Sequence, residues 1–82
     1  MSELLHDDDD QPPLYAKICQ YYFRQITEGA IRPGELLPAA HHVAEKHGIS
    51  TATARRGLKL LAKIGFAQAV PGGPYMALHP EP

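Results

Sequence analysis

Four cationic side chains share one side of residues 51–64, a segment with the composition of an amphipathic helix. At about 100° per residue they fall within one arc of roughly 100°, and no acidic residue joins them. These cations are Arg55, Arg56, Lys59 and Lys63. The opposite arc is apolar and holds Ala54, Gly57, Leu58, Leu60, Leu61 and Ile64. One face of this helix therefore suits a hydrophobic core, and the other is either a solvated surface or a site for a polyanion.

The other reactive side chains do not form a catalytic or metal-binding set. His41 and His42 point about 100° apart on a helix, and His47 is not one turn from either, so no pair has the i, i+4 spacing of helical zinc sites. Cys19 is the only cysteine, which excludes an internal disulfide and a cysteine-based zinc site, and we predict a small buried hydrophobe there. A Ser/His/Asp set and a phosphate loop are missing. We therefore expect no enzymatic activity, no metal and no cofactor.

The length of 82 residues suffices for one small domain, but not for a cleft between lobes. The sequence holds no apolar run near the ~20 residues of a membrane span and no secretory signal, so we expect a cytoplasmic protein without membrane contact.

The formal net charge of -1 hides a strong segregation of charge. Glu3 and Asp7–Asp10 place five negative charges in the first ten residues, and Glu81 adds one near the other end. The segment between them holds eight Lys and Arg against three Glu, a net charge of +5. The predicted folded part is therefore basic, and the near-neutral total does not argue against nucleic-acid binding.

The first element that must position the cationic helix is another helix. We predict a disordered acidic tail at residues 1–12, one domain at 13–79 and a short C-terminal tail at 80–82. Over 14–27, apolar residues recur every four positions, which predicts an amphipathic helix that Gly29 closes. The recurring residues are Leu14, Ile18, Tyr22 and Ile26. The aromatic residues of this helix suit a core or a dimer surface better than a base-stacking platform; they are Tyr15, Tyr21, Tyr22 and Phe23.

A second helix is predicted at 39–47, with Pro38 at its first helical position. Gly48 then supplies a turn, and Ser50 is a good N-cap for the cationic helix. Gly57 inside that helix costs about 1 kcal/mol relative to alanine, and the sequence shows no reason for it.

The remaining segments predict short strands. Ile31 and Leu36–Leu37 flank a turn and suit a very short strand. Phe66–Val70 and Tyr75–Leu78 suit two strands joined by a Pro-Gly-Gly-Pro turn. The predicted fold is mainly α with a small β-hairpin, in the element order of a winged helix-turn-helix: a three-helix core and a two-stranded wing.

With this order, residues 13–78 resemble the DNA-binding domain of the GntR family of bacterial transcription regulators. The resemblance rests on Pro13-Leu14-Tyr15, Ile18, Ile26, Gly29, Ile31, Arg32-Pro33-Gly34, Leu37-Pro38, Val43-Ala44, Gly48-Ile49-Ser50, Thr53, Arg55-Arg56, Leu58, Leu61, Gly65 and Pro71-Gly72. It implies that residues 51–64 are a recognition helix in the major groove of double-stranded DNA. It also implies that the preceding helix supports it and that the wing at 66–78 touches the flanking minor groove.

Carried over by position, the residues that would face DNA are His41, Ser50, Thr51, Ala52, Thr53, Arg55, Gly72 and Gly73. The cationic face adds Arg56 and Lys59 as phosphate or base contacts. The chain departs from the family pattern at Ala39-Ala40-His41 in place of Ser-Glu-Arg, at Thr51 in place of arginine, at Ala52 in place of threonine, and at Gly73-Pro74 in place of a basic residue and glycine. Because these changes remove arginines that could contact guanine, we predict a site that is read partly through thymine methyl groups and DNA shape.

The resemblance implies a small bacterial transcription regulator, most simply a nucleoid-associated repressor that occludes a promoter. Family members usually continue into an effector-binding domain that makes the dimer, so from the end at Pro82 we expect a stand-alone domain without a small-molecule effector. We expect it to pair on DNA as a homodimer or to bind a partner protein. The alternative function is a protein-interaction winged helix with little DNA affinity. Asp7–Asp10 either solubilise the chain or compete with DNA for the basic face.

Overall fold

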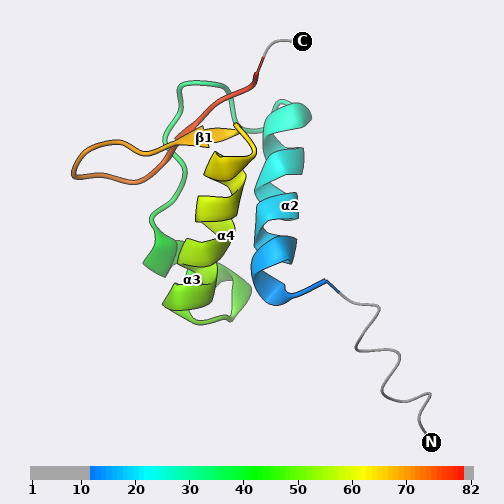
Figure 1. Cartoon of the computed structure of the whole chain (residues 1–82), viewed down its shortest axis with the longest axis vertical. Helices are drawn as coiled ribbons and strands as arrows, with labels where there is room; N and C mark the ends of the chain where they lie inside the picture. The colour runs from blue at the N-terminus through cyan, green and yellow to red at the C-terminus, as the bar shows by residue number, and fades with distance from the viewer. Residues whose placement is uncertain (1–11, 81–82) are drawn as a thin grey trace, which may run out of the picture.

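The computed structural model describes residues 12–80, and nearly all of the predicted acidic tail, with Glu81 and Pro82, lies outside the described residues. Three helices are followed by two short strands (Figure 1). They are α2 (Leu14–Thr27), α3 (Ala40–His47), α4 (Thr51–Lys63), β1 (Ala67–Gln68) and β2 (Met76–Ala77). The predicted order of helices and hairpin is confirmed.

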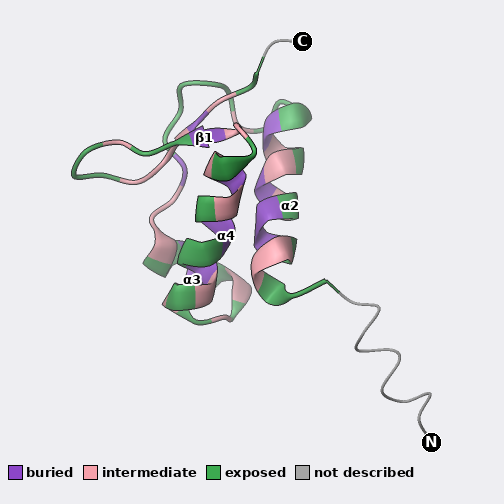
Figure 2. Ribbon diagram, in the orientation of Figure 1, coloured by how far each residue is buried: buried purple, intermediate pink, exposed green. Residues whose placement is uncertain are grey.

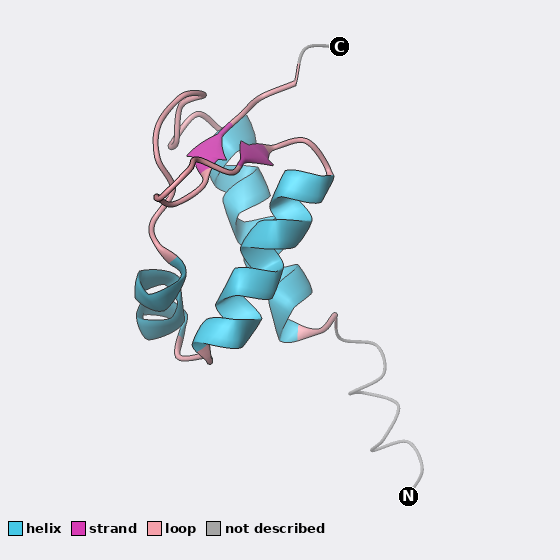
Figure 3. Ribbon diagram, turned by 60° about the vertical axis from the view of Figure 1, so that its left-hand side comes forward, coloured by secondary structure: helices cyan, strands magenta, loops and turns pink. Residues whose placement is uncertain are grey.

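Helices α2 and α4 lie side by side with their N-terminal ends at the same end of the domain, and α3 packs against α4 (Figures 1 and 3). Gly57 lies where α4 meets α2. A β-carbon built on it would be 2.7 Å from the Ile18 Cβ and 2.7 Å from the carbonyl oxygen of Tyr15. The residue that weakens α4 as an isolated helix is therefore the residue that lets the two helices approach.

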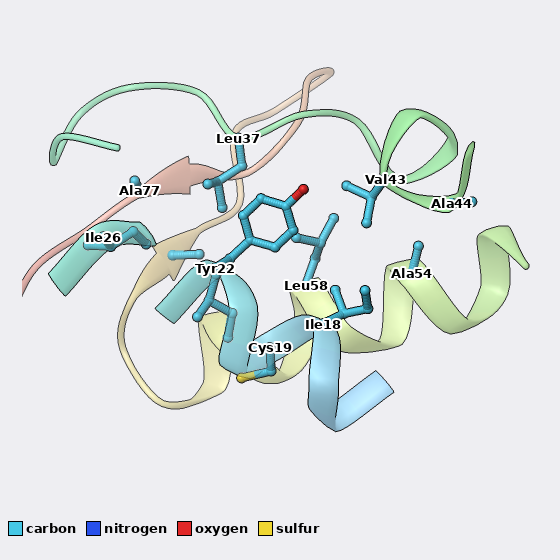
Figure 4. Packing of buried hydrophobic residues seen from close by; sticks show 12 residues of the cluster. Ile18, Cys19, Tyr22, Ile26, Leu37, Val43, Ala44, Ala54, Leu58 and Ala77 are labelled. Atoms are coloured by element: carbon cyan, nitrogen blue, oxygen red, sulfur yellow. The ribbon is translucent and has the colours of Figure 1, made fainter. Parts of the chain in front are cut away.

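The core lies between the three helices and the base of the wing (Figure 2). Its buried residues are Ile18, Cys19, Tyr22, Ile26, Leu37, Val43, Ala44, Ala54, Leu58, Leu61, Ala67 and Ala77. The Tyr22 ring lies between Leu37 and Leu58 (Figure 4). Truncating a fully buried leucine of this kind costs about 2–5 kcal/mol, so a core of this size depends on each of its few large side chains.

Two residues of the predicted apolar stripes face solvent instead. Leu14 is 53% exposed and Ile64 is 47% exposed. Leu14 is the first residue of α2, and Ile64 is the C-cap of α4. Both residues therefore lie at the end of their helix, beyond the part of the helix that packs against a neighbouring element. Cys19, by contrast, is buried as predicted, and burial raises the pKa of its thiol.

Helix α3 begins later than predicted. Its N-cap is Ala39, which has extended backbone, so the prediction that Pro38 occupies the first helical position was wrong. The reason is that Leu37 is still held against the wing, where its N–H donates to the carbonyl of Tyr75 at 2.8 Å. Gly48 then closes α3 in the left-handed conformation, with φ of 67°, a conformation that favours glycine.

The wing is an antiparallel pair in which Ala67 opposes Ala77 and Gln68 opposes Met76. Leu36 forms an isolated bridge with Met76, so the short strand predicted at Leu36–Leu37 is reduced to a single bridged residue at the wing base. Ile31 does not take part in this pairing, because it lies just beyond the end of α2 and its N–H donates to the carbonyl of Gln25 within that helix.

The two wing strands are shorter than predicted. Two prolines, Pro71 and Pro74, stand in the connecting loop and supply no N–H for a ladder, which limits pairing to the base of the hairpin. Among residues 12–80, no helix combines the length and the apolarity needed to cross a bilayer.

Candidate nucleic-acid interface

A groove of about 660 Å³ opens where the first turns of α3 and α4 face the wing. The wing loop and the start of α3 lie on the same side of the molecule (Figure 1). The groove is lined by Pro38, Ala39, Ala40, His41, Thr51, Arg55, Leu58, Ala69, Gly72, Gly73, Pro74 and Tyr75. Three segments that are far apart in the sequence therefore form its walls.

Half of the predicted DNA-facing residues meet in this groove. They are His41 from α3, Thr51 and Arg55 from α4, and Gly72 and Gly73 from the wing tip. The structure thus brings together residues that were predicted from three separate segments. Arg55 is the cation of this set, and its side chain is exposed.

The other predicted residues lie on α4 or at its start, outside the groove lining: Ser50, Ala52, Thr53, Arg56 and Lys59. Ala52, Arg56 and Lys59 are exposed, and Thr53 is half-buried. They extend the surface along α4, away from the wing. Within residues 12–80, no carboxylate forms an ion pair with any of the four cations of α4. The described part of the chain therefore offers these four cations no carboxylate partner.

The start of α4 is fixed by its cap. The N–H of Thr53 donates to Ser50 Oγ at 3.1 Å, and the Ser50 hydroxyl donates to Thr53 Oγ1 at 2.9 Å. The predicted N-cap is confirmed, and a capped first turn holds Thr51 and Ala52 at the surface in one backbone conformation. The Thr53 hydroxyl still has its own proton to donate.

Arg56 does not project freely into solvent. Its guanidinium carbon lies 4.0 Å from the centre of the Tyr15 ring, which belongs to the first turn of α2. The sequence predicts a core or dimer surface for Tyr15 and does not indicate this contact. Spacing within one helix cannot reveal it, since the contact depends on how closely α2 and α4 pack.

The three histidines of α3 occupy two different environments. The rings of His41 and His42 are 4.1 Å apart on the exposed side of α3. His47 instead packs edge-on against Tyr21, with ring centres 4.8 Å apart. Among residues 12–80, no three His, Cys, Asp or Glu side chains come together as a metal site would require. Of the three histidines, His41 alone lines the groove.

A small polar cluster joins α3 to α2 behind the groove. Lys46 Nζ donates to the Tyr21 hydroxyl at 3.3 Å, and this hydrogen bond is the main cause of the raised pKa of Lys46. The ammonium also lies 5.3 Å from the centre of the Tyr21 ring. These contacts hold the supporting helix against α2 and leave Lys46 charged at neutral pH.

Comparison with known proteins gives a consistent result. Residues 14–76 match the family model described as bacterial regulatory proteins, gntR family. The chain is 31% identical over 60 residues to the mannosyl-D-glycerate transport/metabolism system repressor MngR of Escherichia coli (strain K12). That match covers 73% of this chain and 25% of MngR, so the chain spans about a quarter of the length of this curated relative.

Solved structures share the fold. The DNA-binding domain of AraR in complex with operator ORE1 is 25% identical, has a TM-score of 0.77, and matches over 82% of both chains. YtrA from Sulfolobus acidocaldarius, a GntR-family transcription factor, is 22% identical with a TM-score of 0.78, over 88% of this chain and 61% of that chain. The three-helix core with a two-stranded wing is therefore a known architecture.

Proposed function

The chain belongs to the gntR family of bacterial regulatory proteins, and from this premise we propose that it is a transcription regulator that binds double-stranded DNA with a sequence preference. The observation that carries the proposal is the groove shared by α3, α4 and the wing. In it Arg55, without a carboxylate partner among residues 12–80, stands with His41 and the wing tip. The operator complex of the AraR domain supports double-stranded DNA as the ligand.

Helix α4 is the element that enters the major groove in this proposal. The major groove is about 12 Å wide and admits one α-helix. The exposed first turn of α4 would then reach base edges through Thr51 and Ala52, while Arg55 reaches a base edge or a phosphate. The wing tip at Gly72 and Gly73 carries no side chain beyond hydrogen, so its backbone can approach the flanking minor groove closely.

Sequence preference in this arrangement depends on small side chains. Methyl groups of Thr51, Ala52 and Thr53 suit apolar contact with thymine methyl groups, and the threonine hydroxyls can make single hydrogen bonds. We expect in-vitro selection from random duplexes to return thymine-containing steps under α4. A guanine-rich core at those positions would contradict this part of the proposal.

The cations of α4 supply affinity. If about three phosphates are neutralised per domain, the logarithm of the association constant falls with the logarithm of salt concentration at a slope near -2.7. Binding that does not depend on salt would contradict an electrostatic interface.

Repression by promoter occlusion is the simplest regulatory outcome of such binding, and the printed description of MngR as a repressor supports it. One small domain covers few base pairs, so we propose that two copies bind together, or that a partner protein supplies the second contact.

The decisive experiment compares two double variants that remove equal charge. Arg55→Ala/Arg56→Ala removes two cations of α4, and Lys17→Ala/Arg32→Ala removes two exposed cations away from the groove. Fluorescence anisotropy with a nonspecific duplex at low salt should show at least tenfold weaker binding for the first variant and less than twofold for the second. No binding by the wild-type chain would favour the protein-interaction function, and equal losses would place DNA elsewhere.

A further inference from the structure

Tyr15 and Arg56 form a contact between α2 and α4 to which the proposed function assigns no role of its own. The guanidinium carbon of Arg56 lies 4.0 Å from the centre of the Tyr15 ring, so the cation sits on the aromatic face. Tyr15 is half-buried in the first turn of α2, and Arg56 is exposed on α4. No carboxylate within residues 12–80 forms an ion pair with Arg56. The ring is thus the partner that the structure provides for this arginine.

The neighbouring glycine explains why this contact exists. Gly57 follows Arg56, and a β-carbon there would lie 2.7 Å from the backbone carbonyl oxygen of Tyr15. The missing side chain lets the first turn of α2 come directly against α4. The Tyr15 ring is thereby brought against Arg56, at the edge of the cationic face. Helices α2 and α4 begin at the same end of the domain (Figure 3).

A cation–π contact of this kind leaves an arginine competent to bind an anion. The guanidinium is planar, so its face can rest on a ring while its N–H groups remain in the plane and point outward. Those N–H groups match a phosphate in a bidentate geometry. An arginine that is already held also loses less side-chain freedom when it binds.

We propose that Tyr15 is a positioning residue of the DNA interface, which holds the Arg56 guanidinium flat so that its N–H edge meets a backbone phosphate beside the major groove. The inference rests on the proposed DNA-binding function and deepens it. It extends the interface from α4 to the first turn of α2, through a residue that makes its contribution by way of Arg56.

A double-mutant cycle on the whole chain tests the inference, with affinity for a fixed duplex measured by anisotropy over a range of salt. Tyr15→Leu should weaken binding roughly two- to tenfold, the cost of immobilising one additional flexible side chain. Its salt slope should equal that of the wild type, because no charge is removed. Arg56→Ala should lower the slope by about 0.9, and adding Tyr15→Leu to it should change nothing further.

Two conservative variants distinguish a role of Tyr15 in positioning Arg56 from a role in the stability of the fold alone. Tyr15→Phe keeps the ring and should bind like the wild type. Arg56→Lys keeps the charge without the planar group, and should bind more weakly with an unchanged slope. In NMR spectra of the free chain, the Arg56 side-chain protons should show a ring-current shift that Tyr15→Phe keeps and Tyr15→Leu removes.

Several results would overturn the inference. One is that Tyr15→Leu lowers duplex affinity by the same factor in the wild type and in Arg56→Ala. Another is that Tyr15→Phe binds the duplex as weakly as Tyr15→Leu. If Tyr15→Leu does not fold, wild-type affinity of Arg56→Lys or absence of the ring-current shift overturns it. Arg55→Ala distinguishes failure of this inference from failure of the proposed DNA-binding function. If Arg55→Ala weakens duplex binding and Tyr15→Leu does not, only the inference about Tyr15 is wrong. If the wild-type chain does not bind duplex DNA, the proposed function is wrong as well.

Discussion

Gly57 lies so close to Ile18 that a β-carbon built on the glycine would be 2.7 Å from the Ile18 Cβ, well inside van der Waals contact. The same β-carbon would be 2.7 Å from the backbone carbonyl oxygen of Tyr15, which cannot turn aside as a flexible side chain can. The spacing of α2 and α4 therefore depends on the absence of a side chain at one position.

Gly57→Ala should lower the free energy of unfolding, although alanine is the better helix former. Overpacking costs about 1–3 kcal/mol, and the helix-propensity gain recovers at most about 1 kcal/mol. Urea denaturation measures the change. Gly73→Ala is the matched control, because its added β-carbon would meet nothing nearer than Val70 Cγ1 at 3.8 Å. Gly57→Ala as stable as the wild type would contradict the close helix contact.

Variants of Ser50 should distinguish its role in the stability of α4 from its role in DNA binding. Ser50→Ala removes the cap of α4 and should cost about 1 kcal/mol in urea denaturation. Ser50→Asp keeps a capping oxygen and should retain most of the stability, but it adds a negative charge at the proposed phosphate-facing surface. Anisotropy should then show weaker duplex binding for Ser50→Asp than for the control Ala30→Asp, whose new charge lies in the exposed turn after α2. Equal affinities would remove Ser50 from the interface.

Cys19 should make the domain less stable in alkali. Burial raises the pKa of its thiol in the folded state, so the folded form favours the protonated thiol. The contribution of the protonated Cys19 thiol to the free energy of unfolding is fully present below the ordinary thiol pKa of about 8.5. It is lost as the pH rises through the higher folded-state pKa. Unfolding followed from pH 7 to 10 should show a decline that is smaller in Cys19→Ala. An identical decline in both would assign it to other groups, among them Tyr22, whose pKa burial also raises.

His41 should respond to a gain of charge. His41→Arg places a guanidinium in the groove beside Arg55, where it can add a bidentate contact to a base or a phosphate. We expect duplex affinity to rise roughly fivefold or more, with increased preference for guanine in a selection experiment. His79→Arg adds the same charge at an exposed position outside the groove lining and should have a smaller effect. Equal gains would indicate that only net charge matters.

Most of the helical architecture follows from the sequence by local physical chemistry. The four-residue spacing from Leu14 to Ile26 predicts the helix now seen at Leu14–Thr27, and Ser50 predicts the start of α4. Both signals act within one or two helical turns, where side-chain spacing and capping decide the conformation.

The misplaced features depend on contacts between elements. Pro38 suits a first helical turn, but pairing of Leu37 with Tyr75 across the wing delays α3. Ile64 continues the apolar stripe of α4, yet the helix ends there and the side chain is exposed. The reason for Gly57 and the contact of Arg56 with the Tyr15 ring are visible only once α2 is placed against α4.

The hydrogen bonds of Glu35 and Leu37 to the wing have a mechanical consequence for the groove. Ala77 donates to the Glu35 carbonyl, Leu37 donates to the Tyr75 carbonyl, and α3 begins three residues after Leu37. The hairpin is thus hydrogen-bonded to the segment that precedes α3, and one short turn connects α3 to α4. A movement of the wing should therefore also move His41 and Thr51. We expect the walls of the groove to shift together, as one rigid unit, when a ligand binds.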